Sequence, residues 1–431
     1  MPAPVQALEW ALRPATFLER CHRDHGDLIT VRLDVGRAPR VLIAEPQTAS
    51  RILSDPSLTK TPDSRASIIP VFGEESVLLA DGEEHIQRRR RMLPAFHGAK
   101  LKDYHREILA ATDREIEGWP LGRPISLRTR LQRLSLHLIL EAVLGSATQQ
   151  VREESGERMG ALLATVANRR AALAVALPGR LRALLARGAL GPSRADLDAV
   201  IVAEIERRHR AEDLGTDALT DLLVPGDDGE ALGTEVICDQ VRTLLLAGHE
   251  SIATSLAWTI EHLVHAPAAA ERLARESRSE DGDGGKAFAE AILSESLRLS
   301  PPLANTQRQL TAELPTGSYT LPPGTLVTPC AFLIHRRPDL YPEPDKFRPE
   351  RFLDAPPIPR AWMPFGGGAR RCLGAGFARH QMNLILCRLS ERLDFEAASA
   401  ARESVRRRGI VFSPAKGANV VITQRFRSLT G

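Results

Sequence analysis

The chain has 431 residues, of which 43% are hydrophobic and 26% charged, and its formal net charge is +3. This composition is typical of a globular protein with a large core, and the charge is too small to indicate a nucleic-acid partner. The five cysteines are odd in number, widely spaced and without a CxxC pair. They argue against a disulfide framework and a zinc knuckle, and they favour a reducing cytoplasm.

The N-terminal segment predicts neither secretion nor a membrane anchor. Glu9, Arg13 and Glu19 interrupt it, and it lacks the apolar run of a signal peptide. Elsewhere the sequence has no stretch of about 18 consecutive apolar residues, the length that a transmembrane helix needs. We therefore expect a cytoplasmic protein.

Three segments predict β-hairpins, because apolar strands flank turn-forming residues. They are residues 28–44, residues 319–327 with a turn at 322–324, and residues 409–412 with 419–423. These hairpins place the β-rich part of the chain at approximately 28–56, 303–330 and 405–425. The remainder is expected to be helical.

The other segments predict one long loop and several helices. The loop covers residues 57–80, which are rich in proline, serine and glycine. A helix follows Asp81, with His85 and Arg89 on one face. Residues 101–223 have helical spacing, with breaks expected at 118–120, 178–179 and 191–192.

Residues 234–265 predict one helix of about 30 residues, about 45 Å long. At its centre, Gly248 and Glu250 lie in an apolar run. A glycine inside a helix lowers stability by ~1 kcal/mol, and a buried acid lowers it further. Sequences break such local rules mainly at functional sites, so this segment is a candidate site. A helix crossing that needs a small residue, beside an exposed glutamate, explains the same pattern.

A glycine-rich loop presents Cys372 at the start of a helix predicted over 377–393. The unpaired N–H groups of a helix start, its dipole, Arg370 and Arg371 all favour a thiolate, which is either a nucleophile or a metal ligand. A nucleophile needs a histidine base, and His380 lies more than two helical turns further on. A cysteine that only fills space in the core is the third explanation.

The segment Phe365-x-x-Gly368-x-Arg370-x-Cys372-x-Gly374 resembles the haem-binding loop of the cytochrome P450 family. The resemblance implies that Cys372 ligates the haem iron and that Phe365 packs beside the sulfur. It also implies that Gly374 keeps the backbone close to the sulfur, and that Arg370 pairs with a haem propionate.

The helix after Asp81 also matches this family. His85 and Arg89 resemble a motif that contacts a haem propionate, and Arg308 matches another propionate contact. The same helix would present a basic patch on the proximal side, where an acidic, ferredoxin-type electron donor docks. The candidates for this patch are Arg88, Arg90 and Arg91.

The segment Ala247-Gly248-x-Glu250-Ser251 resembles the family's groove above the iron, where an acid and an alcohol help to bring protons to bound oxygen. This chain has serine where threonine is usual. Serine keeps the hydroxyl but lacks the methyl group that restricts the rotamer, so we expect looser coupling of electrons to product.

Glu295-x-x-Arg298 and Arg351 match a structural motif that holds the loop leading to the cysteine in this family. Together the motifs imply one cytochrome P450 domain over residues 1–431, of the soluble bacterial type. Its fold would be mainly α with small β-sheets (α+β), with haem b between the long helix and the cysteine loop.

The resemblance implies a haem-thiolate monooxygenase that uses O2 to hydroxylate or epoxidise a small molecule. The candidate pocket residues are aliphatic, which favours a terpenoid, a fatty acyl chain or a macrolide-like compound of secondary metabolism. They are Ile69, Val71, Leu78, Leu245, Leu303 and Ile410. Alternatives within the family are oxidative coupling, desaturation and a peroxide-driven reaction, against which Glu250 and Ser251 count. Alternatives outside the family are an enzyme that uses Cys372 as a nucleophile and a haem-binding sensor.

Overall fold

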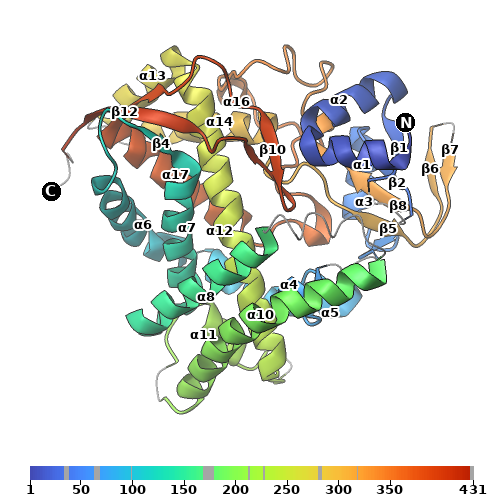
Figure 1. Ribbon diagram of the computed structural model, residues 1–431, viewed down its shortest axis with the longest axis horizontal. Helices are drawn as coiled ribbons and strands as arrows, with labels where there is room; N and C mark the ends of the chain where they lie inside the picture. Colours follow the sequence, from blue (N-terminus) through green and yellow to red (C-terminus); the bar gives the residue numbers. More distant parts are fainter. Residues whose placement is uncertain are drawn as a thin grey trace.

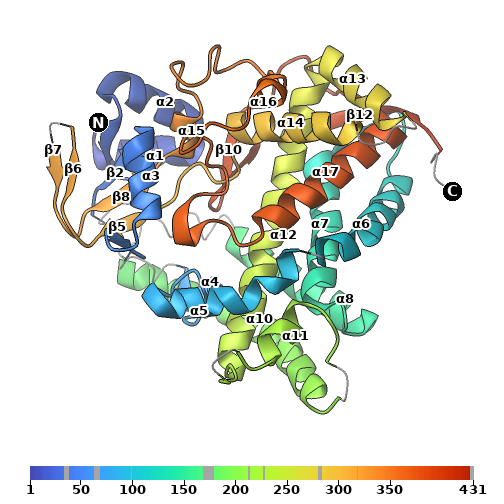
Figure 2. The ribbon, with the colours of Figure 1, turned by 180° about the vertical axis from the view of Figure 1, so that it is seen from behind.

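The computed structural model describes residues 1–33, 38–62, 68–98, 100–167, 179–211, 214–226, 229–279, 284–317 and 319–427. Figure 1 shows a large helical region and, beside it, a smaller region where the N-terminal helices lie against a sheet. The two ends of the chain lie on opposite sides of the molecule (Figures 1 and 2).

Most of the described chain is helical. The helices up to residue 167 are α1 (Ala3–Leu12), α2 (Pro14–His25), α3 (Pro46–Ser54), α4 (Ile69–Phe72), α5 (Gly82–Met92), α6 (Lys100–Glu117), α7 (Leu127–Leu144) and α8 (Gln149–Ala167). The later ones are α10 (Gly179–His209), α11 (Ala218–Leu223), α12 (Thr234–Val264), α13 (Pro267–Ser277), α14 (Gly284–Leu299), α15 (Ala331–Ile334), α16 (Arg351–Asp354) and α17 (Ala375–Arg392). Short 3-10 helices are η2 (Pro94–Phe96) and η4 (Gly368–Arg370). No helix among the described residues is both long and apolar enough to cross a membrane.

The strands that the structure describes form small sheets. The largest has the order β1 (Leu28–Val31), β2 (Arg40–Ile43), β8 (Leu326–Pro329), β5 (Arg308–Leu310) and β3 (Thr59–Lys60). A second has the order β4 (Pro124–Ser126), β12 (Asn419–Arg425) and β9 (Leu393–Ala397). Two pairs remain, β6 (Leu314–Thr316) with β7 (Tyr319–Leu321) and β10 (Val405–Arg408) with β11 (Val411–Pro414).

One of the three predicted hairpins forms as expected. β1 and β2 pair antiparallel, with Leu28 opposite Ile43. The other two predictions are wrong: β7 pairs with β6 while β8 lies between β2 and β5, and β11 pairs with β10 while β12 joins β4 and β9. Turn-forming residues indicate where the chain reverses direction. Which strand each segment then pairs with depends on its contacts with segments elsewhere in the chain.

Two further expectations need correction. Residues 46–54, which were placed in the β-rich part, form α3. The break expected at 191–192 is absent, because α10 continues through Pro192. The break at 118–120 is confirmed by the end of α6, whereas that at 178–179 lies partly outside the described residues.

α12 confirms the long helix predicted over 234–265 and crosses the helical region (Figures 1 and 2). It packs against α7, α10, α14 and α17. Most of its residues between Ile237 and Leu263 are buried. Because a helix that is covered on all sides belongs to the core, α12 can offer groups to a ligand only where this burial is interrupted.

A buried ion pair joins α14 to the segments that precede the cysteine loop. Glu295 and Arg298 are both fully buried and are joined by N–O distances of 2.7 and 2.8 Å. Arg351 donates to Glu295 at 3.0 Å, so the structure brings together the three residues of the expected motif. Arg298 also donates to the backbone carbonyls of His335 and Pro344, each at 2.8 Å.

We expect Glu295→Gln to lower the free energy of unfolding by about 3 kcal/mol, because Arg298 would keep a buried charge without its counter-charge. Glu290→Gln is the matched control on the same helix. Glu290 pairs with Arg379 at a partly exposed position, so its loss should cost less than ~1 kcal/mol. Urea unfolding followed by circular dichroism measures both values, and equal losses would contradict this interpretation.

Candidate active site

The cysteine loop makes a close turn against α3. Cys372 lies between η4 and α17, and its backbone N–H donates to the Phe365 carbonyl at 2.9 Å. Gly366 and Gly368 have φ angles of 69° and 62°, in the left-handed region that glycine tolerates. A Cβ on Gly368 would lie 1.9 Å from the carbonyl oxygen of Leu53. Glycine is therefore required where the loop crosses α3.

Burial opposes the thiolate that the sequence predicts at Cys372, and neighbouring groups favour it. The residue is exposed, but desolvation by the surrounding protein raises the pKa of its thiol. The Gly374 N–H and the charges of Arg89 and Arg371 lower the pKa without outweighing burial. A further positive charge, such as a metal ion, is needed to hold the thiolate.

Four basic side chains from three segments, namely α5, β5 and the cysteine loop itself, converge here and are called the basic cluster: His85, Arg89, Arg308 and Arg370. Burial and then the charge of Arg370 lower the pKa of Arg308 to about 10. Burial, followed by Arg370 and Arg89, lowers the pKa of His85 to about 4, so His85 is neutral at pH 7. Asp81 is the acid that opposes these shifts in the described residues. The cluster has an excess of positive charge and suits an anionic ligand.

Arg370 has a protein partner that the sequence did not predict. Its guanidinium donates to the Asp81 carboxylate and to the Ala80 carbonyl. Asp81 also accepts from the backbone N–H and the hydroxyl of Thr61, each at 2.9 Å. Arg370 therefore ties the cysteine loop to the start of α5. Asp81 was missed as a site residue, because its position before a helix indicated only a cap.

Within the buried part of α12, the stretch Ala247–Ser251 interrupts the burial, although His249 inside it is buried. Ala247 is exposed and Ser251 partly exposed, whereas Leu246 and Ile252 on either side are buried. The Ser251 hydroxyl donates to the Ala247 carbonyl at 2.9 Å. This interruption of burial allows α12 to face a bound group, as the resemblance implies.

Gly248 allows two helices to approach closely. A Cβ on Gly248 would lie 2.6 Å from Cδ1 of Ile139 on α7, and the Ser135 hydroxyl donates to the Gly248 carbonyl at 3.3 Å. The interpretation of Gly248 as space above the haem is therefore corrected. The missing side chain is needed for packing against α7, at interior density.

Glu250 is directed to α7. Arg128 donates to one carboxylate oxygen at 2.5 and 3.2 Å, and Gln132 donates to the other. The hydroxyl of Thr254 also donates to this carboxylate, at 3.4 Å. The acid expected to help in oxygen activation is thus engaged by three side chains and must leave its partners on α7 to take part. These partners lie 122 and 118 residues away in the sequence, and no local signal indicated them.

The exposed stretch of α12 lies between two flanking contacts. Before it, the hydroxyls of Ser76 and Thr243 are 2.8 Å apart. After it, Trp258 donates to the Phe412 carbonyl at 3.0 Å, and the Phe412 N–H donates to the Pro302 carbonyl at 2.8 Å. The loop before α5 and the strand β11 therefore contact α12 on either side of this stretch.

Three of the six predicted pocket residues adjoin these contacts in the chain. Leu78, Leu303 and Ile410 are 41%, 40% and 68% exposed. Leu245 is fully buried in the core that α12 shares with α7 and α10, so its assignment to the pocket is wrong. The remaining two, Ile69 and Val71, lie on α4 and are partly buried.

The expected basic docking patch is only partly present. Arg90 is exposed, but Arg88 is buried and pairs with two glutamates, so its assignment was wrong. Helical spacing explains this, because His85, Arg88 and Met92 share the buried face of α5. Arg91 donates to backbone carbonyls of the segment after α11.

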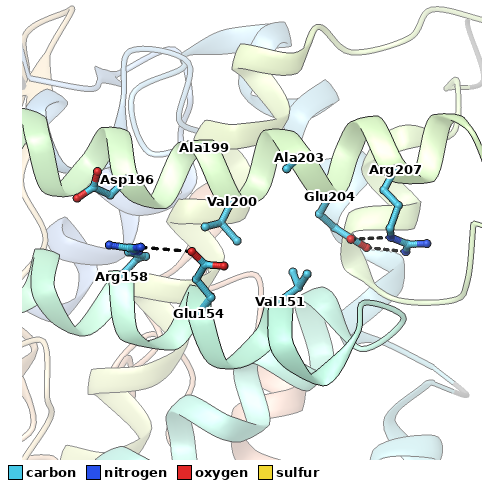
Figure 3. A pocket seen from close by; sticks show the side chains of 9 residues that line it. All are labelled: Val151, Glu154, Arg158, Asp196, Ala199, Val200, Ala203, Glu204 and Arg207. Atoms are coloured by element: carbon cyan, nitrogen blue, oxygen red, sulfur yellow. Dashed lines mark hydrogen bonds and ion pairs between the residues drawn. The ribbon is translucent and has the colours of Figure 1, made fainter.

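A surface groove of about 470 Å³ lies between α8 and α10 (Figure 3). Four of the five charged side chains that line it pair with one another, Arg158 with Glu154 at 3.3 Å and Arg207 with Glu204 at 2.8 Å. The residues that line it include none from the cysteine loop, the basic cluster or the exposed stretch of α12. It is therefore separate from the candidate site.

The haem that the resemblance implies fits the residues present. Cys372 offers an accessible sulfur that needs a positive partner, and the basic cluster offers positive charge for two carboxylates. The described residues contain no group of three or more side chains that could hold a metal ion.

Proteins similar to this chain are named cytochromes P450. The putative cytochrome P450 135B1 of Mycobacterium tuberculosis (strain ATCC 25618 / H37Rv) is 31% identical over 422 residues, covering 96% of this chain and 89% of that protein. The putative cytochrome P450 137 of the same strain is 35% identical over 361 residues, covering 83% and 74%.

The fold has a close relative among solved structures. The structure titled "Retinoic acid bound cyanobacterial CYP120A1" has a TM-score of 0.80 and 23% identity, covering 96% of this chain and 95% of that chain. The family model described as Cytochrome P450 matches residues 5–420. Because this match spans nearly the whole sequence, the chain belongs to the cytochrome P450 family.

Proposed function

We propose that this protein is a haem-thiolate monooxygenase that inserts one oxygen atom from O2 into an apolar or amphipathic small molecule. Its family binds haem and uses O2 and redox partners to oxidise small molecules. The observation that carries the proposal is the combination of an accessible Cys372, the basic cluster and the exposed stretch Ala247–Ser251 on a helix that is otherwise buried.

The residues near the cysteine loop would bind and orient the cofactor. Haem, when bound, supplies the redox chemistry that activates O2. Cys372 Sγ would hold the iron, and the Gly374 N–H would donate to this sulfur and tune its electron density. Arg308 and Arg89 would pair with the propionates, and the neutral imidazole of His85 would donate a hydrogen bond.

Ser251 and Glu250 would manage protons on the other side of the site. The Ser251 hydroxyl donates to the Ala247 carbonyl and must turn to donate a proton into the site. Glu250 must release Arg128 and Gln132 before its carboxyl group can exchange a proton with water or with Ser251. Proton delivery would therefore depend on the rotation of two side chains.

The substrate would meet an aliphatic surface. Leu78, Leu303 and Ile410 are exposed where they adjoin the borders of the α12 stretch. Such a lining favours a terpenoid, a fatty acyl chain or a macrolide-like compound over a small polar molecule. Electrons would arrive from a ferredoxin-type partner, for which Arg90 and Arg371 are the exposed cations closest in sequence to the haem-binding residues.

Cys372→Ala should abolish the red-shifted absorption band of the reduced carbon monoxide complex, because that band requires a thiolate ligand on iron. Cys387→Ala, further along α17, should leave the band in place. Absorption spectra of the reduced, carbon monoxide-treated proteins measure the difference. A band that persists in Cys372→Ala would refute the assignment of this ligand.

Leu303→Gln should weaken the binding of apolar ligands about fivefold, because an aliphatic contact is replaced by an amide that must be desolvated. Leu353→Gln is the matched control, since both leucines are 40% exposed and Leu353 lies on α16. Titrations of terpenoid and fatty acid ligands, followed by the low-to-high spin shift, give the dissociation constants. A clear preference for small polar ligands would contradict the proposed substrate class.

Ser251→Thr should raise the product formed per electron consumed by up to about twofold, because the added methyl group limits the hydroxyl to fewer rotamers. Ser251→Ala should lower this ratio, since it removes the hydroxyl. Product and reductant consumption, measured together at saturating O2, give the ratio. Unchanged or poorer coupling in the threonine variant would disprove the expectation.

A further inference from the structure

The outward face of α1 is apolar, which reverses the usual arrangement of a surface helix. Every exposed residue among residues 1–12 is an aliphatic residue, a methionine or a proline. The largest are Met1, Val5, Leu8 and Leu12, with exposed fractions of 59%, 41%, 58% and 66%. Val5, Leu8 and Leu12 are spaced as one helical stripe, which a globular protein normally turns towards its core.

The polar side chains of α1 are turned inward and engaged. Gln6 accepts a hydrogen bond from the backbone of Arg32 at 2.8 Å, and Glu9 forms an ion pair with Arg20 of α2. Trp10 is buried and packs against strand β11 at a ring distance of 5.6 Å. Rotation of α1 to bury its apolar stripe would break these contacts, so the present orientation is the stable one.

Two exposed arginines lie near this stripe among the described residues. Arg13 directly follows α1 and is exposed, and Arg32 is exposed next to the helix. The guanidinium of Arg407 lies 5.4 Å from the ring of Trp10. Each acid of α1, α2 and the following turn forms an ion pair with an arginine. These acids are Glu9, Glu19, Asp24 and Asp27. Arg13 and Arg32 therefore place exposed positive charge beside the stripe.

We propose that α1 adsorbs to an anionic lipid bilayer, with Val5, Leu8 and Leu12 among the acyl chains and the neighbouring arginines at the head groups. Apolar side chains bordered by cations are the features that hold a helix in the plane of a membrane interface. The ten residues of α1 span about 15 Å, half of the ~30 Å hydrocarbon core, so the helix lies on the bilayer and does not cross it.

A second copy of the chain fits this stripe less well. The stripe offers a few hundred Å² of apolar surface, and two copies would bury less than the ~1,200 Å² of a stable interface. Adsorption to a bilayer requires no minimum buried area, because each apolar side chain that inserts adds to the affinity. Adsorption would bring β11, which packs against Trp10, close to the lipid. The proposal does not depend on the substrate class.

The test is flotation of the full-length, haem-loaded protein with lipid vesicles. We expect it to float with phosphatidylcholine vesicles that contain phosphatidylglycerol, and to float less with phosphatidylcholine alone or at high salt. Leu12→Gln should lower the partition coefficient about tenfold, and Leu8→Gln should give a similar loss. Leu121→Gln should have no effect, because this leucine is 53% exposed in the segment between α6 and β4.

Failure of the wild type to float with anionic vesicles would overturn the proposal, as would equal losses in Leu12→Gln and Leu121→Gln. A dimer that Leu12→Gln dissociates, without vesicle binding by the wild type, would assign the stripe to a second copy instead. The carbon monoxide spectrum and the unfolding temperature should match the wild type in all three variants. These two readouts separate lost adsorption from lost folding, and also from failure of the haem-thiolate assignment.

Discussion

The buried ion pair between Glu295 and Arg298 is the interaction on which the position of the cysteine loop depends most. Arg298 donates to the carbonyl of His335, whose Nε2 accepts the backbone N–H of Met363 at 2.9 Å. Burial lowers the pKa of His335 to about 3, so the ring stays neutral and keeps one acceptor nitrogen. Met363 opens the loop that carries Cys372. A series of buried polar contacts therefore runs from α14 to the start of the cysteine loop, and breaking it would leave a buried charge unpaired.

The candidate site contains two electrostatic costs that one ligand would offset together. Burial raises the pKa of the Cys372 thiol, and burial with mutual repulsion lowers the pKa of Arg308 and of His85. The thiolate needs a cation, and the basic cluster needs anions. A macrocycle that carries iron at its centre and two carboxylates at its edge supplies both. This complementarity is a physical reason, beyond the motif, for assigning haem to this site.

Much of the site could be predicted where the signal is local. The glycine loop, the helix after it, the Glu295–Arg298 spacing and the length of α12 all follow from backbone geometry and hydrophobic period over a few residues. The same reasoning was wrong at Arg88 and Gly248. Arg88 is buried because α5 packs through the face that also carries His85, and Gly248 is small because Ile139 lies against it.

The sequence by itself indicated the family and the order of the motifs and predicted the iron ligand, because these depend on side chains held within one turn or one loop. Only the tertiary structure decided which partner each charge finds: Asp81 for Arg370, and Arg128 with Gln132 for Glu250. It also decided that α1 turns Trp10 inward and its leucines outward. Pairing across more than a hundred residues depends on which helices pack together, and a short segment of sequence carries no record of its distant neighbours.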